Sequence, residues 1–187
     1  MEWTEADHDA VTDARRQLLD RFRWTGGHAD VWRVFSNDAA LAAVVHGLAA
    51  PWRSWGVTRV AGIESRGFLL GGAVAVTLGV GFAAIRKADG LFPGAKVTAE
   101  AATDYRGLRH QLRMQKSVDS RDRVLLVDDW AEHGSQALAA RQLIESCGAS
   151  FAGASLMVDQ LGPGPLLALG RVTSLVRADE LGEASGT

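Results

Sequence analysis

Short runs of aliphatic residues alternate along the chain with segments of helical period, and this alternation limits the fold more than any other feature. Segments 67–78 and 135–147 carry apolar residues at helical spacing. Apolar runs typical of buried strands occur at residues 57–63, 82–87, 123–128, 151–158 and 172–176. Alternating units of this length favour a parallel sheet covered by helices on both faces. The sequence therefore predicts an α/β fold with an open, mainly parallel, twisted sheet.

The N-terminal part of the chain precedes these alternating units. In residues 5–23, apolar side chains recur at helical spacing between charged ones, which predicts an amphipathic helix. Residues 31–35, with the sequence VWRVF, are predicted to be extended. We expect one domain over residues 1–187, in which residues 1–35 form a helical hood segment and residues 36–187 form the core.

Charge and composition argue against several classes of protein. The 20 basic and 22 acidic residues give a net charge of −2, so no general excess of positive charge would bind nucleic acid. The uncharged stretch 68–85 contains four glycines, and we expect a helix and a strand there rather than a membrane span. Cys147 is the only cysteine, and the chain opens without a signal-peptide pattern, so the cytoplasm is the expected location.

Two adjacent carboxylates, Asp128 and Asp129, end the apolar run VLLV, and the chain then turns through residues 133–136 into a predicted helix. Unpaired N–H groups at a helix N-terminus bind phosphate, and neighbouring carboxylates can accept hydrogen bonds from vicinal hydroxyls or hold a magnesium shell. A sugar phosphate would satisfy both features. A pair of this kind is also common as a solvated strand end, so both interpretations stay open on this motif alone.

A second group of candidate residues follows the first predicted strand of the sheet. Ser65, Arg66 and Gly67 lie between this strand and the next helix. A guanidinium can bind phosphate through two hydrogen bonds, and glycine lets the backbone approach a ligand closely. Arg86 and Lys87 end the next strand. Because the carboxyl ends of parallel strands meet at one edge of a sheet, these cations would lie near the same site.

In their order along the chain, several segments resemble motifs of the type I phosphoribosyltransferases, and their wording is closest to the adenine phosphoribosyltransferases. They are VWRVF, AGIESRGFLLG, LGVGFAAIRK, a loop with Asp104 and Tyr105, and VLLVDDWAEHGS. The resemblance runs from about residue 18 to about residue 160, and the combination is specific although each motif alone is not. It implies that 5-phosphoribosyl-1-pyrophosphate (PRPP) and a purine base give a nucleoside 5′-monophosphate and pyrophosphate through an oxocarbenium-like transition state.

The resemblance also implies roles for individual residues. Asp128 and Asp129 would hold the ribose hydroxyls, and Asp104 and Tyr105 would lie on a loop that closes over the site and excludes water. These four are the candidate catalytic residues. PRPP would also contact Ser65, Arg66, Gly67, Arg86, Lys87, His133, Gly134, Ser135 and Gln136, and the base would contact Val31, Trp32 and Arg33.

Cofactor and assembly follow from the same resemblance. Mg²⁺ would be carried by PRPP near Asp128 and Asp129 rather than held in a site built by the protein alone. The family commonly forms homodimers, which is therefore the expected assembly. The partners would be PRPP and a purine base, with no nucleic acid and no membrane.

The phosphate loop departs from the family pattern. Residues 132–136 read Glu-His-Gly-Ser-Gln where the family usually reads Ala-Thr-Gly-Gly-Thr. Two alternatives to an adenine-type enzyme therefore stay open. One is a regulatory module that binds PRPP or a nucleotide without catalysis, and the other is a phosphoribosyltransferase for a different heterocycle.

Overall fold

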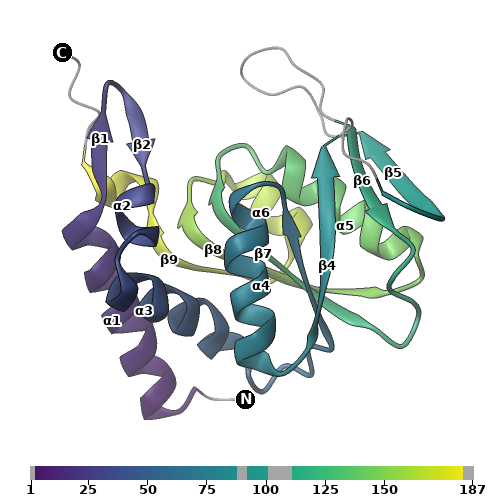
Figure 1. Cartoon of the computed structure of the whole chain (residues 1–187), viewed down its shortest axis with the longest axis horizontal. Helices are drawn as coiled ribbons and strands as arrows, with labels where there is room; N and C mark the ends of the chain where they lie inside the picture. The colour runs from purple at the N-terminus through teal and green to yellow at the C-terminus, as the bar shows by residue number, and fades with distance from the viewer. Residues whose placement is uncertain (1–2, 88–91, 101–110, 183–187) are drawn as a thin grey trace.

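A twisted seven-stranded sheet lies at the centre of the computed structural model, which describes residues 3–87, 92–100 and 111–182 (Figure 1). The strand order is β5-β6-β4-β3-β7-β8-β9, and β4, β3, β7, β8 and β9 run parallel to one another. At one edge of this sheet, β6 pairs in the antiparallel sense with both β4 and β5. The strands are β3 (Arg59–Ile63), β4 (Gly81–Lys87), β5 (Lys96–Glu100), β6 (Gln111–Gln115), β7 (Arg123–Ala131), β8 (Ser150–Asp159) and β9 (Val172–Arg177). The predicted mainly parallel α/β sheet is confirmed.

Helices cover both faces of this sheet. The helices are α1 (Glu5–Arg21), α2 (Trp32–Phe35), α3 (Asp38–Ala49), α4 (Arg66–Leu78), α5 (Ser135–Ser146) and α6 (Pro163–Leu169), with short 3₁₀ turns at Ala50–Trp52 and Ala178–Leu181. Alternate residues of β7 point to opposite faces. Leu125 and Val127 join a core with α1, α3 and α4, whereas Val124 and Leu126 join a second core with α5. Both cores therefore hold the strand that carries Asp128 and Asp129.

The segment between α1 and α3 differs from its prediction. Residues 31–35 form a short helix instead of an extended piece, and the Ser36 N–H donates to the Trp32 carbonyl at 2.8 Å. The β-branched and aromatic residues favour a strand locally, but Val31, Val34 and Phe35 are buried at helical spacing against the core. Tertiary packing therefore overrides the local preference.

Two features were missing from the prediction. The first helix ends at Arg21, and the next residues form a hairpin of β1 (Arg23–Thr25) and β2 (His28–Asp30), whose turn uses Gly26 and Gly27 at φ values of 56° and 74°. Strand β5 lies in a polar stretch for which no strand is predicted, whereas the sequence of residues 110–115, HQLRMQ, is also compatible with an additional strand, and β6 forms there. Within the described ranges, no helix is long and apolar enough to cross a membrane.

Candidate active site

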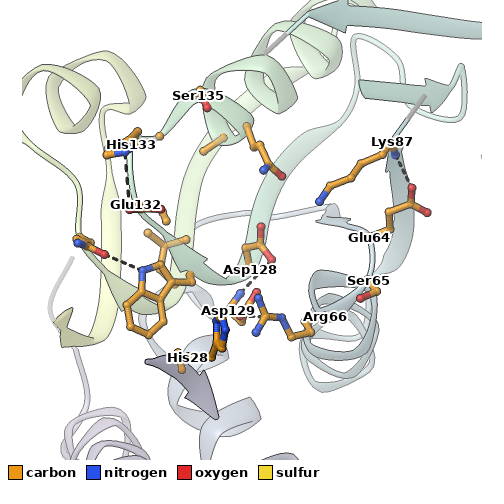
Figure 2. Close-up of a pocket in the computed structure, with 18 of the residues that line it drawn as sticks. His28, Glu64, Ser65, Arg66, Lys87, Asp128, Asp129, Glu132, His133 and Ser135 are labelled. Carbon is orange, nitrogen blue, oxygen red and sulfur yellow. Dashed lines mark hydrogen bonds and ion pairs between the residues drawn. The ribbon is translucent and has the colours of Figure 1, made fainter. Parts of the chain in front are cut away.

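A cavity of about 620 Å³ lies at the carboxyl ends of the parallel strands. Its walls come from the turn after β3, the end of β4, the end of β7 with the loop into α5, the residue after β8, and the β1–β2 hairpin (Figure 2). The cavity thus occupies the edge of the sheet at which ligands of open α/β folds bind.

Asp128 and Asp129 lie in the middle of this cavity wall. The Asp129 N–H donates to Asp128 Oδ1 at 3.0 Å, and Asp129 is only 4% exposed. Burial, followed by the neighbouring Asp129 carboxylate, raises the pKa of Asp128 well above its usual 3.8. Burial also raises the pKa of Asp129, and the Arg66 guanidinium opposes this effect. A ligand that donates hydrogen bonds or carries positive charge would therefore stabilise the ionised form of this pair.

The turn from β3 into α4 brings a cation against this acidic pair. Arg66 begins α4, and its Nε atom lies 3.0 Å from Asp129 Oδ2. At Gly67, an added Cβ would lie 2.9 Å from Asp128 Oδ1, so only glycine lets the first turn of α4 come this close to the carboxylate. Ser65 and Arg66 line the cavity, and the Glu64–Ser65 peptide bond is cis.

Glu64 is a site residue that the sequence analysis missed. Its Oε1 accepts a hydrogen bond from the Lys87 N–H at 2.6 Å, and its Oε2 accepts one from Arg86 Nε at 2.9 Å. Lys87 lines the cavity, whereas Arg86 lies outside the lining, with its guanidinium 5.9 Å from the centre of the Phe92 ring. The position of Glu64 inside the IESRGF motif was the signal that could have identified it.

The loop from β7 to α5 forms the opposite wall. Gly134 adopts a φ of 74° and α5 begins at Ser135, so the first N–H groups of the helix have no carbonyl of an earlier helical turn to bond. Ser135 and Gln136 line the cavity, as do His133 and Gly134. A Cβ on Gly134 would lie 2.8 Å from Pro165 Cβ, which adds a packing reason for glycine. The wall therefore offers amide donors to an anion.

Two side chains beside these amides change the local charge. His133 Nε2 lies 3.7 Å from Glu132 Oε1, and both residues line the cavity (Figure 2). Their side chains are 58% and 40% exposed, respectively, so solvent screens this pair. An anion at the helix N-terminus would meet one acidic and one basic side chain in addition to the amides.

The predicted base-binding residues lie outside the cavity lining. Val31 is fully buried, and the exposed Trp32 packs edge-on against Phe35 with ring centres 5.6 Å apart. Arg33 Nε lies 3.0 Å from Asp30 Oδ2. Their role in base binding stays a prediction. The lining instead includes Trp24, Gly27, His28 and Ala29 from the hairpin, with Trp130 and Gln160. Asp104 and Tyr105 lie outside the described residues.

The carboxylate oxygens of the site are the donor atoms that could bind Mg²⁺. In the described part of the chain, no three His, Cys, Asp or Glu side chains are grouped to hold a metal ion. Asp129 Oδ2 is buried and accepts no hydrogen bond from the described residues, although Arg66 lies nearby. Mg²⁺ is commonly bound by one or two carboxylates together with substrate phosphates and water. The site therefore fits an ion that arrives with a phosphate-bearing substrate.

Comparisons with known proteins agree with this geometry. No family model matches the sequence. Over 134 residues, the chain is 41% identical to an adenine phosphoribosyltransferase of Nocardioides sp., covering 70% of this chain and 71% of the relative. The structure of a Giardia lamblia APRTase complexed with 9-deazaadenine superposes with a TM-score of 0.76 at 32% identity, covering 89% and 97% of the two chains. An adenine phosphoribosyltransferase from Thermoanaerobacter pseudethanolicus gives 0.78 at 26% identity, covering 87% and 99%. The chain therefore belongs to the adenine phosphoribosyltransferase family.

Proposed function

We propose that the protein transfers the 5-phosphoribosyl group of PRPP to adenine and so produces AMP and pyrophosphate. The observation that carries the proposal is the joining of three features in one cavity: the adjacent carboxylates Asp128 and Asp129, the N-terminus of α5, and the cations Arg66 and Lys87. These features match the ribose, the 5′-phosphate and the pyrophosphate of PRPP, respectively. The family relationship supports adenine as the base.

The amides at the start of α5 would hold the 5′-phosphate, with further donors from His133, Ser135 and Gln136. Asp128 and Asp129 would accept hydrogen bonds from the ribose 2′- and 3′-hydroxyls. These contacts hold the ribose through its 5′-phosphate and through its 2′- and 3′-hydroxyls. The reacting carbon, C1′, would then face both the leaving group and the incoming base in a fixed orientation.

The reaction forms a bond from adenine N9 to C1′ and breaks the bond from C1′ to the pyrophosphate oxygen. The electron pair leaves with pyrophosphate, and the proton on N9 is released. Positive charge develops on the ribose in the transition state, and the nearby carboxylates Asp128 and Asp129 would stabilise it. Mg²⁺ bound to PRPP would neutralise charge on the leaving group.

Pyrophosphate would lie against the turn that connects β3 with α4. Ser65, Arg66 and Gly67 would contact it there, and Lys87 would approach from β4. Glu64 binds the Lys87 backbone and the Arg86 side chain, so Arg86 would act by supporting this arrangement. The site would then hold positive charge where negative charge accumulates during bond cleavage.

Several further parts of the proposal follow from the family resemblance. The base would contact the backbone around Val31, Trp32 and Arg33, and a loop with Asp104 and Tyr105 would exclude water from the reacting atoms. The enzyme would require Mg²⁺, act as a homodimer, and work in the cytoplasm as part of purine salvage. One domain would carry the whole activity.

Formation of AMP from PRPP and adenine tests the proposed function directly. The purified protein is mixed with PRPP, Mg²⁺ and adenine, and AMP is identified by chromatography. Parallel reactions with hypoxanthine and guanine measure the base preference. Formation of AMP at a rate proportional to protein concentration is expected. Saturable binding of PRPP without turnover of any base would instead support a regulatory module.

A further inference from the structure

One part of the cavity wall is not used by the phosphate, ribose and pyrophosphate contacts. It is formed by Trp24 and His28 of the hairpin, by Trp130 at the end of β7, and by Gln160 after β8. In the view of Figure 2, His28 lies on the Asp129 side of the site, away from Ser135. Indole rings offer flat apolar surfaces that suit a planar heterocycle. This wall is therefore the part of the cavity that fits a base, and it leads along the hairpin through Ala29 to the segment 31–33 that is proposed above to contact the base through its backbone.

Trp130 and Gln160 form a hydrogen-bonded pair within this wall. Trp130 Nε1 donates to Gln160 Oε1 at 3.0 Å. An indole N–H is only a donor, so the amide oxygen of Gln160 has to be its partner. The amide NH₂ group is thereby turned away from the indole and keeps both of its donors. Among the described residues, no acceptor takes a hydrogen bond from that group.

Both residues of the pair are held in place by other contacts. Trp130 packs against Trp24 with ring centres 6.0 Å apart, and against Phe22 at 6.3 Å. The Gln160 N–H donates to the Ala131 carbonyl at 2.9 Å, which ties the end of β8 to the end of β7. A pre-oriented amide loses little conformational freedom when it binds a ligand. The pair thus has the rigidity that recognition of one edge of a base requires.

We propose that Gln160 recognises the base through its side-chain NH₂ group, which donates a hydrogen bond to a ring nitrogen of the purine. Trp130 is a positioning residue that fixes the amide orientation. This inference rests on the proposed function and adds the residue that selects the base. Because the pair presents donors, it favours bases with an unprotonated acceptor at the contacted edge and disfavours bases that carry a proton there.

The most informative variant is Gln160→Glu. It keeps an oxygen acceptor for Trp130 and removes both amide donors, and the side chain stays nearly the same size. We expect the KM for adenine to rise about tenfold or more, because a carboxylate would face a ring acceptor, whereas the KM for PRPP changes by less than about twofold. Gln160→Leu removes the amide altogether and gives a second test at this exposed position. Gln142→Leu, at an exposed position on α5 outside the cavity, is the matched control.

Deaza analogues identify the contacted atom. Each of 1-deazaadenine, 3-deazaadenine and 7-deazaadenine lacks one ring acceptor, and kcat/KM is measured for each with the wild-type protein and with Gln160→Leu. For one analogue, kcat/KM should be about fivefold to tenfold lower than for adenine in the wild-type protein, and this difference should disappear in Gln160→Leu. The other two analogues should keep the same ratios in both proteins.

The Trp130→Phe variant tests the positioning role. It keeps an aromatic ring and removes the indole donor, so the KM for adenine should rise by a smaller factor than in Gln160→Glu, with kcat nearly unchanged. Combined with Gln160→Leu, it should add little further loss, because both changes remove the same oriented donor.

The possible outcomes separate this inference from the proposed function. No AMP formation by the wild-type protein would reject the function itself. Normal AMP formation, with the same KM for adenine and the same analogue ratios in Gln160→Glu and Gln160→Leu, would overturn only the role of Gln160. Circular dichroism and thermal unfolding of each variant establish that a change in KM does not come from loss of the fold.

Discussion

Arg66 Nε lies 3.0 Å from Asp129 Oδ2, and this contact ties the first turn of α4 to the end of β7. The Asp129 side chain is 6% exposed and the Arg66 side chain is 36% exposed, so the pair is buried on one side and open to the cavity on the other. The cation proposed for pyrophosphate and the carboxylate proposed for ribose are thus linked before substrate binds. Each holds the other in place.

The Arg66→Gln variant should therefore lose stability as well as activity. Removing one partner of a fully buried pair costs about 3–5 kcal/mol, and solvent near Arg66 should reduce this to about 1–2 kcal/mol. Denaturant unfolding measures the loss, and the KM for PRPP should rise in the same variant. Arg121→Gln, which breaks an exposed ion pair with Asp119, is the control and should leave both quantities nearly unchanged. Equal stability of Arg66→Gln and wild type would argue against the buried ion pair.

Gly67 and Gly72 lie in the same helix and give opposite predictions. A Cβ at Gly67 would lie 2.9 Å from Asp128 Oδ1 and 3.2 Å from the Val127 carbonyl, whereas a Cβ at Gly72 would meet no atom within 4 Å. Gly67→Ala should therefore displace Asp128 and lower kcat/KM by about tenfold or more. Gly72→Ala should raise the free energy of unfolding by about 0.5–1 kcal/mol because alanine is the better helix former. Normal activity in Gly67→Ala would refute the close approach.

The mainly parallel character of the sheet and the location of the candidate site at its carboxyl edge were predictable, because both depend on local pattern. The apolar run before Asp128 and the helical spacing after Ser135 fix a strand followed by a helix, and parallel strands bring their ends together. Family motifs then identified the turn at Arg66, which the structure places in the same cavity.

The parts that could not be predicted depend on contacts between distant residues. Residues 31–35 have strand-forming side chains, yet burial of Val34 and Phe35 against the core makes them helical. The role of Glu64 follows from its bonds to Arg86 and Lys87, more than 20 residues away. The link between Trp130 and Gln160 joins two strands whose pairing no local pattern specifies.

The raised pKa of Asp128 predicts an unusual pH dependence of stability. From pH 3.8 up to the raised pKa, the folded state binds more protons than the unfolded state, so this carboxyl makes the protein less stable as pH rises. Asp128→Asn removes that effect, and its unfolding free energy should increase relative to wild type as pH rises from about 4 to about 7. Turnover should fall strongly at the same time because the ribose contact is weakened.

Glu180 provides a control, because its effect on stability changes with pH in the opposite direction to that of Asp128. Its hydrogen bond with Arg15 lowers the pKa of Glu180 to about 2, so the stabilisation is present above pH 4.5 and is lost as pH falls toward about 2. Glu180→Gln should therefore destabilise the protein at neutral pH and have little effect near pH 2. Parallel pH slopes for the Asp128 and Glu180 variants would contradict the assignment.

The unusual phosphate loop predicts that two neighbouring side chains act in opposite directions. Glu132 and His133 both line the cavity at the N-terminus of α5. A carboxylate repels a bound phosphate and an imidazole can donate to it, so Glu132→Ala should lower the KM for PRPP and His133→Ala should raise it, each by about threefold to tenfold. Steady-state kinetics at low salt gives the largest contrast, since salt screens exposed charges. The same direction of change in both variants would contradict the opposite roles of the two side chains, and an unchanged KM in both would show that the loop acts through its backbone alone.

Glu64 should control PRPP binding without touching the substrate. Its carboxylate binds the Lys87 N–H at 2.6 Å and Arg86 Nε at 2.9 Å, which places the end of β4 beside the turn at Ser65. In Glu64→Ala, the end of β4 loses this anchor, and the KM for PRPP should rise by about tenfold while the KM for adenine stays within about twofold.

A second exposed ion pair makes this prediction specific. Arg141 Nε binds Glu145 Oε1 at 2.8 Å on α5, and neither residue lines the cavity. Glu145→Ala should therefore leave both KM values unchanged, although it also removes a carboxylate from an arginine. Glu64→Gln keeps one amide oxygen as an acceptor, so it should recover part of the PRPP affinity that Glu64→Ala loses. If Glu64→Ala instead raises both KM values equally, Glu64 supports the fold of the whole site and not the PRPP side alone.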